Sequence, residues 1–62
     1  MHRYEVGLTD TDGDLMIVNV VAEEGDTDQT ILELARQIAV EKEGGIPDDY
    51  TRKYITPLRS AQ

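Results

Sequence analysis

The stretch Thr9-Asp10-Thr11-Asp12-Gly13-Asp14-Leu15 decides the fold, because it separates two segments that both have strand patterns. Asp12-Gly13 between such segments is a strong hairpin signal, since glycine adopts a positive φ without steric cost. A three-residue loop of residues 11–13, with Gly13 left-handed, brings three apolar pairs onto one face of the hairpin. These pairs are Leu8 with Met16, Val6 with Val18, and Tyr4 with Val20.

The same stretch has alternating carboxylates, which raises the alternative of a calcium loop. An EF-hand loop places its glycine after a third acid and requires a glutamate at its twelfth position. Here Gly13 precedes Asp14, and the twelfth position counted from Asp10 is Val21. The sequence therefore favours a turn, and we expect no metal site.

The segments around this loop indicate two strands and a helix. Residues 3–9 alternate between apolar and other side chains, and residues 15–22 are almost continuously apolar and rich in β-branched types. Residues 28–43 place apolar side chains at helical spacing. Three residues compete to cap this helix, namely Asp26 (paired with Gln29 in a capping box), Thr27 and Asp28. Gly44-Gly45 predicts its end.

A third strand is expected over residues 50–56, closed by Pro57, with fraying from residue 58 onward. The order of elements predicts an α+β fold of the β-β-α-β type, in which the third strand lies beside the first. One helix then covers one face of a three-stranded antiparallel sheet. At 62 residues without cysteine, the chain is expected to form a single small domain.

Charge is distributed unevenly along the chain. The chain has 13 acidic and 6 basic residues, which gives a net charge of −7. Residues 1–49 contain all the acids and three of the bases, whereas residues 50–62 contain three bases and no acid. Direct binding to nucleic acid is disfavoured, because it requires basic residues to neutralise phosphates. A basic protein surface is the better expectation for a partner.

The longest uninterrupted apolar run, Leu15 to Val18, is far too short for a membrane span, and the N-terminus lacks the pattern of a secretion signal. We therefore expect a cytoplasmic protein without a membrane partner. His2 is the sole histidine and has no spaced ligand or nucleophile, so no catalytic residue and no cofactor are expected.

Two groups of charged and aromatic residues are candidates for partner binding. On a strand, Arg52 would lie on the same side as Tyr50 and Tyr54, with Lys53 on the other side, and tyrosine and arginine are enriched at binding hot spots. The alternative is an ordinary cross-strand ladder in which Arg52 meets Glu5. The second group is acidic and serves either to mimic phosphates or to cap the helix. It consists of Glu23, Glu24, Asp26 and Asp28.

An apolar interface is predicted from Leu15, Ile17 and Val21, which point away from the helix in the expected register. Either a partner or a second copy of the chain would cover them. The alternatives are coverage by Met1 or the C-terminal tail, and a shifted register in which these residues form the core.

Two runs carry a resemblance to a known family, namely Leu32-Glu33-Leu34-Ala35 in the helix and Tyr50-Thr51-Arg52 at the third strand. With the order of elements, they make the chain resemble the small bacteriophage proteins that inhibit host RNA polymerase, which have a Thr-Arg pair in the last strand. That family's first strand contains a tryptophan, which is missing here. The resemblance implies that Arg52 contacts the polymerase, that acidic residues contribute charge, and that no residue is catalytic.

The acidic turn from Asp10 to Asp14 also resembles that of antitoxin domains, in which an acidic protein neutralises a basic RNase. Their Pro-Gly segment after the second strand is absent here. The expected function is thus a non-enzymatic, acidic inhibitor or modulator of a nucleic-acid-handling enzyme. An antitoxin-like or self-associating subunit is the alternative.

Overall fold

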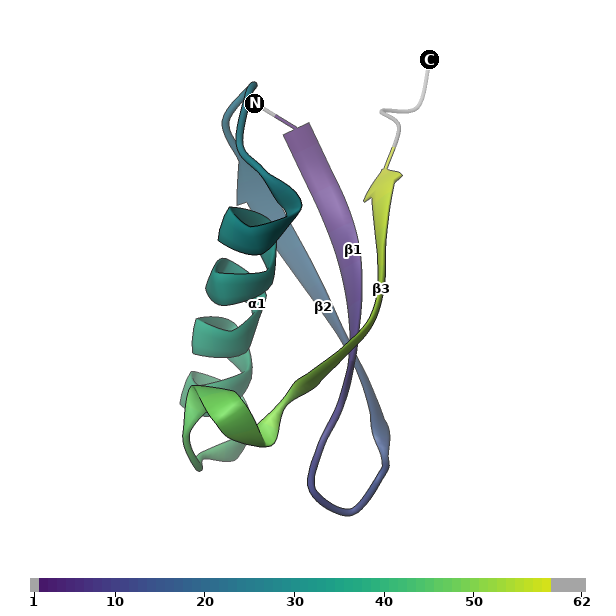
Figure 1. Cartoon of the computed structure of the whole chain (residues 1–62), viewed down its shortest axis with the longest axis vertical. Helices are drawn as coiled ribbons and strands as arrows, with labels where there is room; N and C mark the ends of the chain where they lie inside the picture. The colour runs from purple at the N-terminus through teal and green to yellow at the C-terminus, as the bar shows by residue number, and fades with distance from the viewer. Residues whose placement is uncertain (1, 59–62) are drawn as a thin grey trace.

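The computed structural model describes residues 2–58, which form three strands and one α-helix. In chain order they are β1 (His2–Thr9), β2 (Leu15–Ala22), α1 (Asp28–Glu43), the 3-10 helix η1 (Pro47–Asp49) and β3 (Thr51–Leu58). The strands form one antiparallel sheet in the order β2-β1-β3, and α1 covers one face of it (Figure 1). The predicted α+β fold is confirmed, including the position of β3 beside β1.

The β1–β2 hairpin has the predicted loop and register. The N–H of Asp10 donates to the carbonyl of Asp14 at 3.1 Å, and the N–H of Gly13 donates to the carbonyl of Asp10 at 3.0 Å. Gly13 has a φ of 85°, which is the left-handed conformation expected for the last loop residue. The predicted pairs are all present: Leu8 with Met16, Val6 with Val18, and Tyr4 with Val20. The alternative of a shifted register is therefore wrong.

The core lies between the sheet and α1. Alternate residues of β1 and β2 meet the inward stripe of the helix, because side chains on a strand alternate between its two faces. One further residue, Tyr50, closes the core beyond the end of the helix. The buried apolar residues are Val6, Leu8, Val18, Val20, Ala22, Ile31, Leu32, Ala35, Ala39 and Tyr50.

Of the three candidate caps for α1, the structure selects Thr27. Its hydroxyl accepts a hydrogen bond from the backbone N–H of Thr30 at 3.3 Å, which satisfies one of the unpaired donors of the first turn. The predicted capping box of Asp26 is wrong, because the carboxylate of Asp26 accepts a hydrogen bond from the N–H of Glu23 within the preceding loop. The helix ends at Gly44, whose φ is 87° and whose N–H donates to Val40 at 2.8 Å.

Strand β3 differs from its prediction at both ends. Tyr50 lies outside the strand, because residues 47–49 form η1 and the N–H of Tyr50 donates to the carbonyl of Pro47. Pro57 does not close the strand, which continues to Leu58. Proline is tolerated there because β3 is an edge strand, whose outward positions need no N–H donor. Residues 59–62, for which fraying is predicted, lie outside the described residues.

Within residues 2–58, α1 is neither long nor apolar enough to cross a membrane.

Candidate protein-binding site

The side chains of Tyr50, Arg52 and Tyr54 were predicted to lie on one side of β3, but they do not form one surface. Tyr54 pairs with Gly7 and Arg52 pairs with Leu8, so the exposed Lys53 is an extra residue between them. Such a β-bulge interrupts the alternation of side chains. Because Gly7 and Leu8 point to opposite faces of β1, Tyr54 lies on the uncovered face and Arg52 on the helix side. The expectation that these three residues share one side is therefore wrong.

Tyr50 is a core residue, with only 4% of its surface exposed. Its hydroxyl donates to the carbonyl of Gly44 at 2.7 Å and lies 3.4 Å from the carbonyl of Ala39. Its own carbonyl accepts a hydrogen bond from Nε of Arg36 at 2.9 Å. Tyr50 therefore ties the end of α1 to the start of β3, and its ring is not available to a partner.

Tyr54 covers the centre of β1 on the uncovered face. Its ring lies directly over Gly7, at the position that a Cβ atom would take on any other residue. Its hydroxyl donates to the carboxylate of Glu5 at 2.8 Å, so the predicted partner of Arg52 is bonded to Tyr54 instead. Tyr54 is half-buried, and of the two proposed tyrosines it is the one that a partner could contact.

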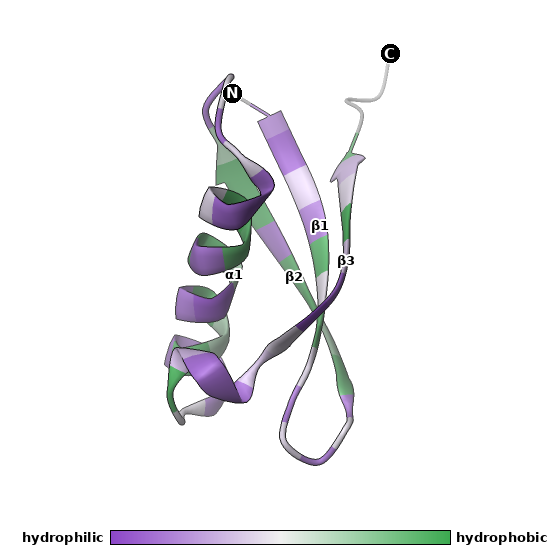
Figure 2. Ribbon diagram, viewed as in Figure 1, coloured by the Kyte–Doolittle hydropathy of each residue, from purple (hydrophilic) through white to green (hydrophobic). Residues whose placement is uncertain are grey.

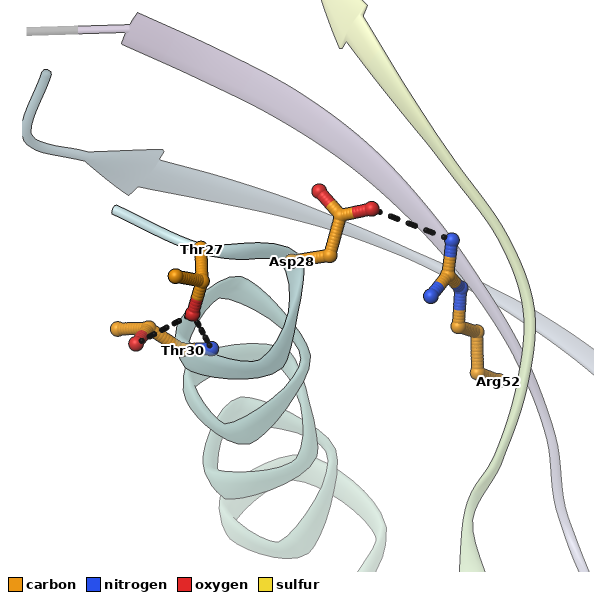
Figure 3. Close-up of polar contacts among 4 residues, drawn as sticks. All are labelled: Thr27, Asp28, Thr30 and Arg52. Atoms are coloured by element: carbon orange, nitrogen blue, oxygen red, sulfur yellow. Dashed lines mark hydrogen bonds and ion pairs between the residues drawn. The ribbon is translucent and has the colours of Figure 1, made fainter. Parts of the chain in front are cut away.

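Arg52 reaches the first turn of α1 (Figure 3). Its Nη2 lies 3.5 Å from the Oδ2 atom of Asp28, the residue that follows the Thr27 cap. Both side chains are well exposed, and ion pairs in that position contribute at most about 1 kcal/mol. The guanidinium group is thus positioned by Asp28 and yet remains open to a stronger acidic ligand.

Two groups of acidic residues lie at opposite ends of the elongated molecule, which measures 37 × 19 × 17 Å (Figure 1). One end, here called the α1-start pole, is the predicted group Glu23, Glu24, Asp26 and Asp28. The opposite end, the hairpin pole, joins the β1–β2 loop to the end of α1 and η1, where an open hollow is lined partly by Asp10, Asp12, Glu43 and Asp49.

The hairpin pole as a single cluster was not predicted. Its members come from three segments that are distant in sequence, and the fold places them around one open hollow at the same end of the molecule (Figure 1). Asp12-Gly13 and Gly44-Gly45 marked both loops as turns, but no local pattern showed that the two turns would lie side by side.

Asp10, Asp12 and Asp14 come close together in the hairpin loop, and their carboxylate oxygens lie within 4.8 Å of one another. The Oδ1 atom of Asp10 accepts hydrogen bonds from the backbone N–H groups of Asp12 and Asp14, each at 2.9 Å. Aspartate commonly forms such bonds in turns. The arrangement accounts for the loop geometry, which is the role that the sequence favours.

Leu15, Ile17 and Val21 are exposed on the uncovered face of the sheet, as predicted, with 56%, 54% and 53% of their surface accessible. Figure 2 shows hydrophobic residues along β2, whereas the start of β3 is hydrophilic. Leu58 is exposed at the other edge of the sheet, and it is separated from Val21 by Arg3 of β1, which pairs with both residues. Coverage of the patch by Met1 or the C-terminal tail concerns residues outside the described range.

Comparisons of the chain with protein-family models, with curated proteins and with solved structures give no match.

The two hydrogen-bonded tyrosines predict a loss of stability in alkaline solution. Burial and the nearby carboxylates of Glu43, Asp49 and Asp10 raise the pKa of Tyr50 above its ordinary value of 10.0. The hydrogen bond to Glu5, followed by burial, raises the pKa of Tyr54. Below pH 10 both phenols are protonated in the folded and unfolded chains, so their contribution is complete. Above pH 10 the unfolded chain loses these protons first, and the free energy of unfolding falls.

The measurement is thermal unfolding on either side of pH 10, with tyrosinate absorbance followed in the folded protein. The variant with Tyr50→Phe and Tyr54→Phe should show a smaller alkaline loss of stability than the parent. Titration of both phenols in the folded protein at the ordinary tyrosine pKa would contradict the prediction.

Proposed function

We propose that the chain is a non-enzymatic, acidic protein-binding module that inhibits or modulates an enzyme acting on nucleic acid. It would act in the bacterial cytoplasm in the manner of the phage inhibitors of RNA polymerase, by covering a basic surface of its target. The observation that carries the proposal is the pair of acidic poles at the two ends of one elongated domain.

Enzymes that hold nucleic acid offer basic grooves, because phosphates are neutralised by lysine and arginine. A body with ten more acids than bases over residues 1–49 is attracted to such a groove, and the attraction also speeds association. The α1-start pole is formed by a loop and a helix start, and the hairpin pole by a tight turn and a helix end. The loop of each pole is closed by a backbone hydrogen bond, from the N–H of Asp26 to Glu23 and from the N–H of Gly13 to Asp10, which favours a defined spacing of charge over a merely solubilising one.

Arg52 and Lys53 give this acidic body an orientation on its target. They stand on the edge strand β3, where the bulge directs both side chains into solvent. Arg52 already binds one exposed carboxylate, Asp28, at 3.5 Å, and an acidic residue of the target would compete for the same donors. Tyr54 adds aromatic surface on the other side of the sheet.

The Arg52→Glu substitution is expected to weaken partner binding by about tenfold or more, since a charge reversal against an acidic partner group costs more than 1.4 kcal/mol. The domain should stay folded, because Arg52 is half exposed and its ion pair with Asp28 adds little stability. Binding is measured by calorimetry and folding by circular dichroism. Arg3→Glu is the matched control, because it makes the same charge change on an exposed residue of β1. Equal binding by a folded Arg52→Glu protein would remove Arg52 from the site.

The function itself is tested by affinity capture from bacterial lysate at low and high salt, followed by mass spectrometry. A single nucleic-acid-handling enzyme that is retained at low salt and released at high salt supports the proposal, because salt screens exposed charges. Inhibition of that enzyme by the purified protein would complete the test. If no such enzyme is retained, the proposal fails.

The second candidate function is self-association as an antitoxin-like or assembly subunit. It is favoured by the exposed apolar residues Leu15, Ile17 and Val21. Light scattering distinguishes the two candidates, because two chains of net charge −7 repel each other and salt would strengthen their dimer. Salt weakens the binding of a basic partner.

A further inference from the structure

The two outer edges of the sheet are unequal. β2 and β3 are the edge strands, and each has backbone groups that point away from β1. β3 carries Arg52, Lys53 and Pro57, and charged residues and proline are the usual means by which an edge is kept from pairing. β2 has the sequence LMIVNVVA, with no charge and no proline over its whole length. Among the strands that residues 2–58 form, β2 is therefore the edge strand that lacks these blocking residues.

The register fixes which groups of β2 are free. Asp10 and Asp14 form a hydrogen-bonded pair at the loop, and such pairs alternate along an antiparallel ladder. The backbone groups of Met16, Val18 and Val20 therefore face β1. The outward groups belong to the alternate residues Leu15, Ile17, Asn19 and Val21. In residues 2–58 no strand lies along this edge.

The residues whose backbone groups point away from β1 also have their side chains on the face of the sheet that α1 does not cover. Leu15, Ile17 and Val21 lie on the uncovered face and are each more than half exposed. A strand added beside β2 would continue the sheet and place its own alternate side chains next to them. Backbone bonding and apolar contact are thus available at one place, and Figure 2 shows this strand as the most continuously hydrophobic of the three.

The charges at the two ends of β2 determine which kind of strand can bind beside it. Asp14 directly precedes the strand and Asp12 lies three residues before its start, whereas Glu23 and Glu24 directly follow it, and all four are exposed. A second copy of β2 would bring the same acids against these ends and be repelled. A strand with lysine or arginine on both sides of its apolar centre would instead meet acids at each end.

We propose that the outer edge of β2 binds an extended segment of the target, alternately apolar and flanked by basic residues, as a fourth strand of the sheet. The inference rests on the proposed function, since it names the segment of the basic partner that this module grips. Added strands gain affinity from main-chain hydrogen bonds and specificity from alternate side chains. The eight residues of β2 set the length of the bound segment at about 26 Å.

The test uses the whole protein and a synthetic peptide in which valine and threonine alternate between lysine-rich ends. The proposal expects the backbone N–H groups of Ile17, Asn19 and Val21 to exchange rapidly with deuterium in the free protein. They should become at least about tenfold slower when the peptide saturates the protein, because they then enter a ladder. Amides that already face β1 provide the internal control. Protection on β3 alone, or no binding, would overturn the proposal.

Modified peptides separate backbone pairing from simple charge attraction. Methylation of the peptide amides that face β2 should abolish binding, whereas methylation of the alternate set should be tolerated. Equal binding by both methylated peptides contradicts strand addition. Replacing the lysines with glutamates should weaken binding at low salt by about tenfold or more. Equal affinity for both charged forms would remove the acidic ends of β2 from the site.

Protein variants complete the test. Asn19→Pro removes one outward donor without removing a bond to β1, and Ile17→Lys places a charge on the edge. Each folded variant should bind the peptide at least about tenfold more weakly. Gln37→Lys, which makes the same charge change as Ile17→Lys on an exposed residue of α1, should bind it as the parent does. Protection of the β2 amides in the free protein that grows with its concentration would assign the edge to a second copy, against the proposal. If salt-sensitive capture of a basic enzyme persists in these variants, strand addition fails while the proposed function stands.

Discussion

The Tyr50→Ala protein is expected to lose most of its stability and to unfold at a much lower urea concentration than the parent. Truncating a buried aromatic side chain costs about 3–5 kcal/mol, and the hydrogen bonds to Gly44 and Ala39 are lost with it. Stability in small domains is about 0.05–0.15 kcal/mol per residue, which is about 3–9 kcal/mol for 62 residues. The substitution therefore removes most of the stability. Circular dichroism and urea titration measure the result.

Tyr50→Phe is the matched control, because it keeps the ring in the core and removes only the hydroxyl group. Loss of the hydrogen bond to Gly44 should cost about 1–2 kcal/mol and leave the protein folded. A stable, cooperative Tyr50→Ala protein would mean that this residue does not tie β3 to the helix. For binding studies, only the phenylalanine variant can separate contact with a partner from loss of the fold.

The second large effect is expected at Gly7. A Cβ atom there would lie 2.6 Å from Cδ2 and 2.8 Å from Cζ of Tyr54, so the ring would have to move and its hydrogen bond to Glu5 would break. Forcing a methyl group into a packed contact costs about 1–3 kcal/mol. Gly7→Ala should therefore lower the urea midpoint without changing the slope of the unfolding transition.

A double-mutant cycle isolates the cause of this loss. In a Tyr54→Ala background the ring is absent, and Gly7→Ala should cost much less than it does in the parent protein. The difference is expected to exceed about 1 kcal/mol, which is the coupling typical of residues in direct contact. Additive effects of the two substitutions would show that the ring does not restrict Gly7.

Local patterns were sufficient for most of the fold. The Asp12-Gly13 turn set the hairpin register, and the apolar stripe around Ile31 and Ala35 set the helix. Both signals act between residues that are close in sequence, or between two strands joined by one tight turn. The register in turn placed Leu15, Ile17 and Val21 on the uncovered face, so the apolar part of the candidate site was predictable.

The part formed by β3 was not predictable, because it depends on contacts across the whole chain. Tyrosine is common in strands, so Tyr50 was assigned to β3, but the η1 turn before it directs its ring into the core. The bulge at Lys53 lets Tyr54 lie over Gly7 while Arg52 turns toward Asp28. The sequence around Lys53 carries no local signal for a bulge. Strict alternation of the β3 side chains between the two faces was therefore expected, and this expectation was wrong.

The central position of β1 has a consequence for the order of folding. Its pairing with β2 closes only the loop of residues 10–14, whereas Thr9 and Thr51 meet across a sequence separation of 42. Closing the longer loop has the larger entropic cost, so the hairpin should form early and β3 should dock late. During synthesis the ribosome also releases β3 last. Until that strand arrives, β1 is itself an open edge, and the nascent domain is exposed to mispairing with neighbouring chains at both sides of its hairpin.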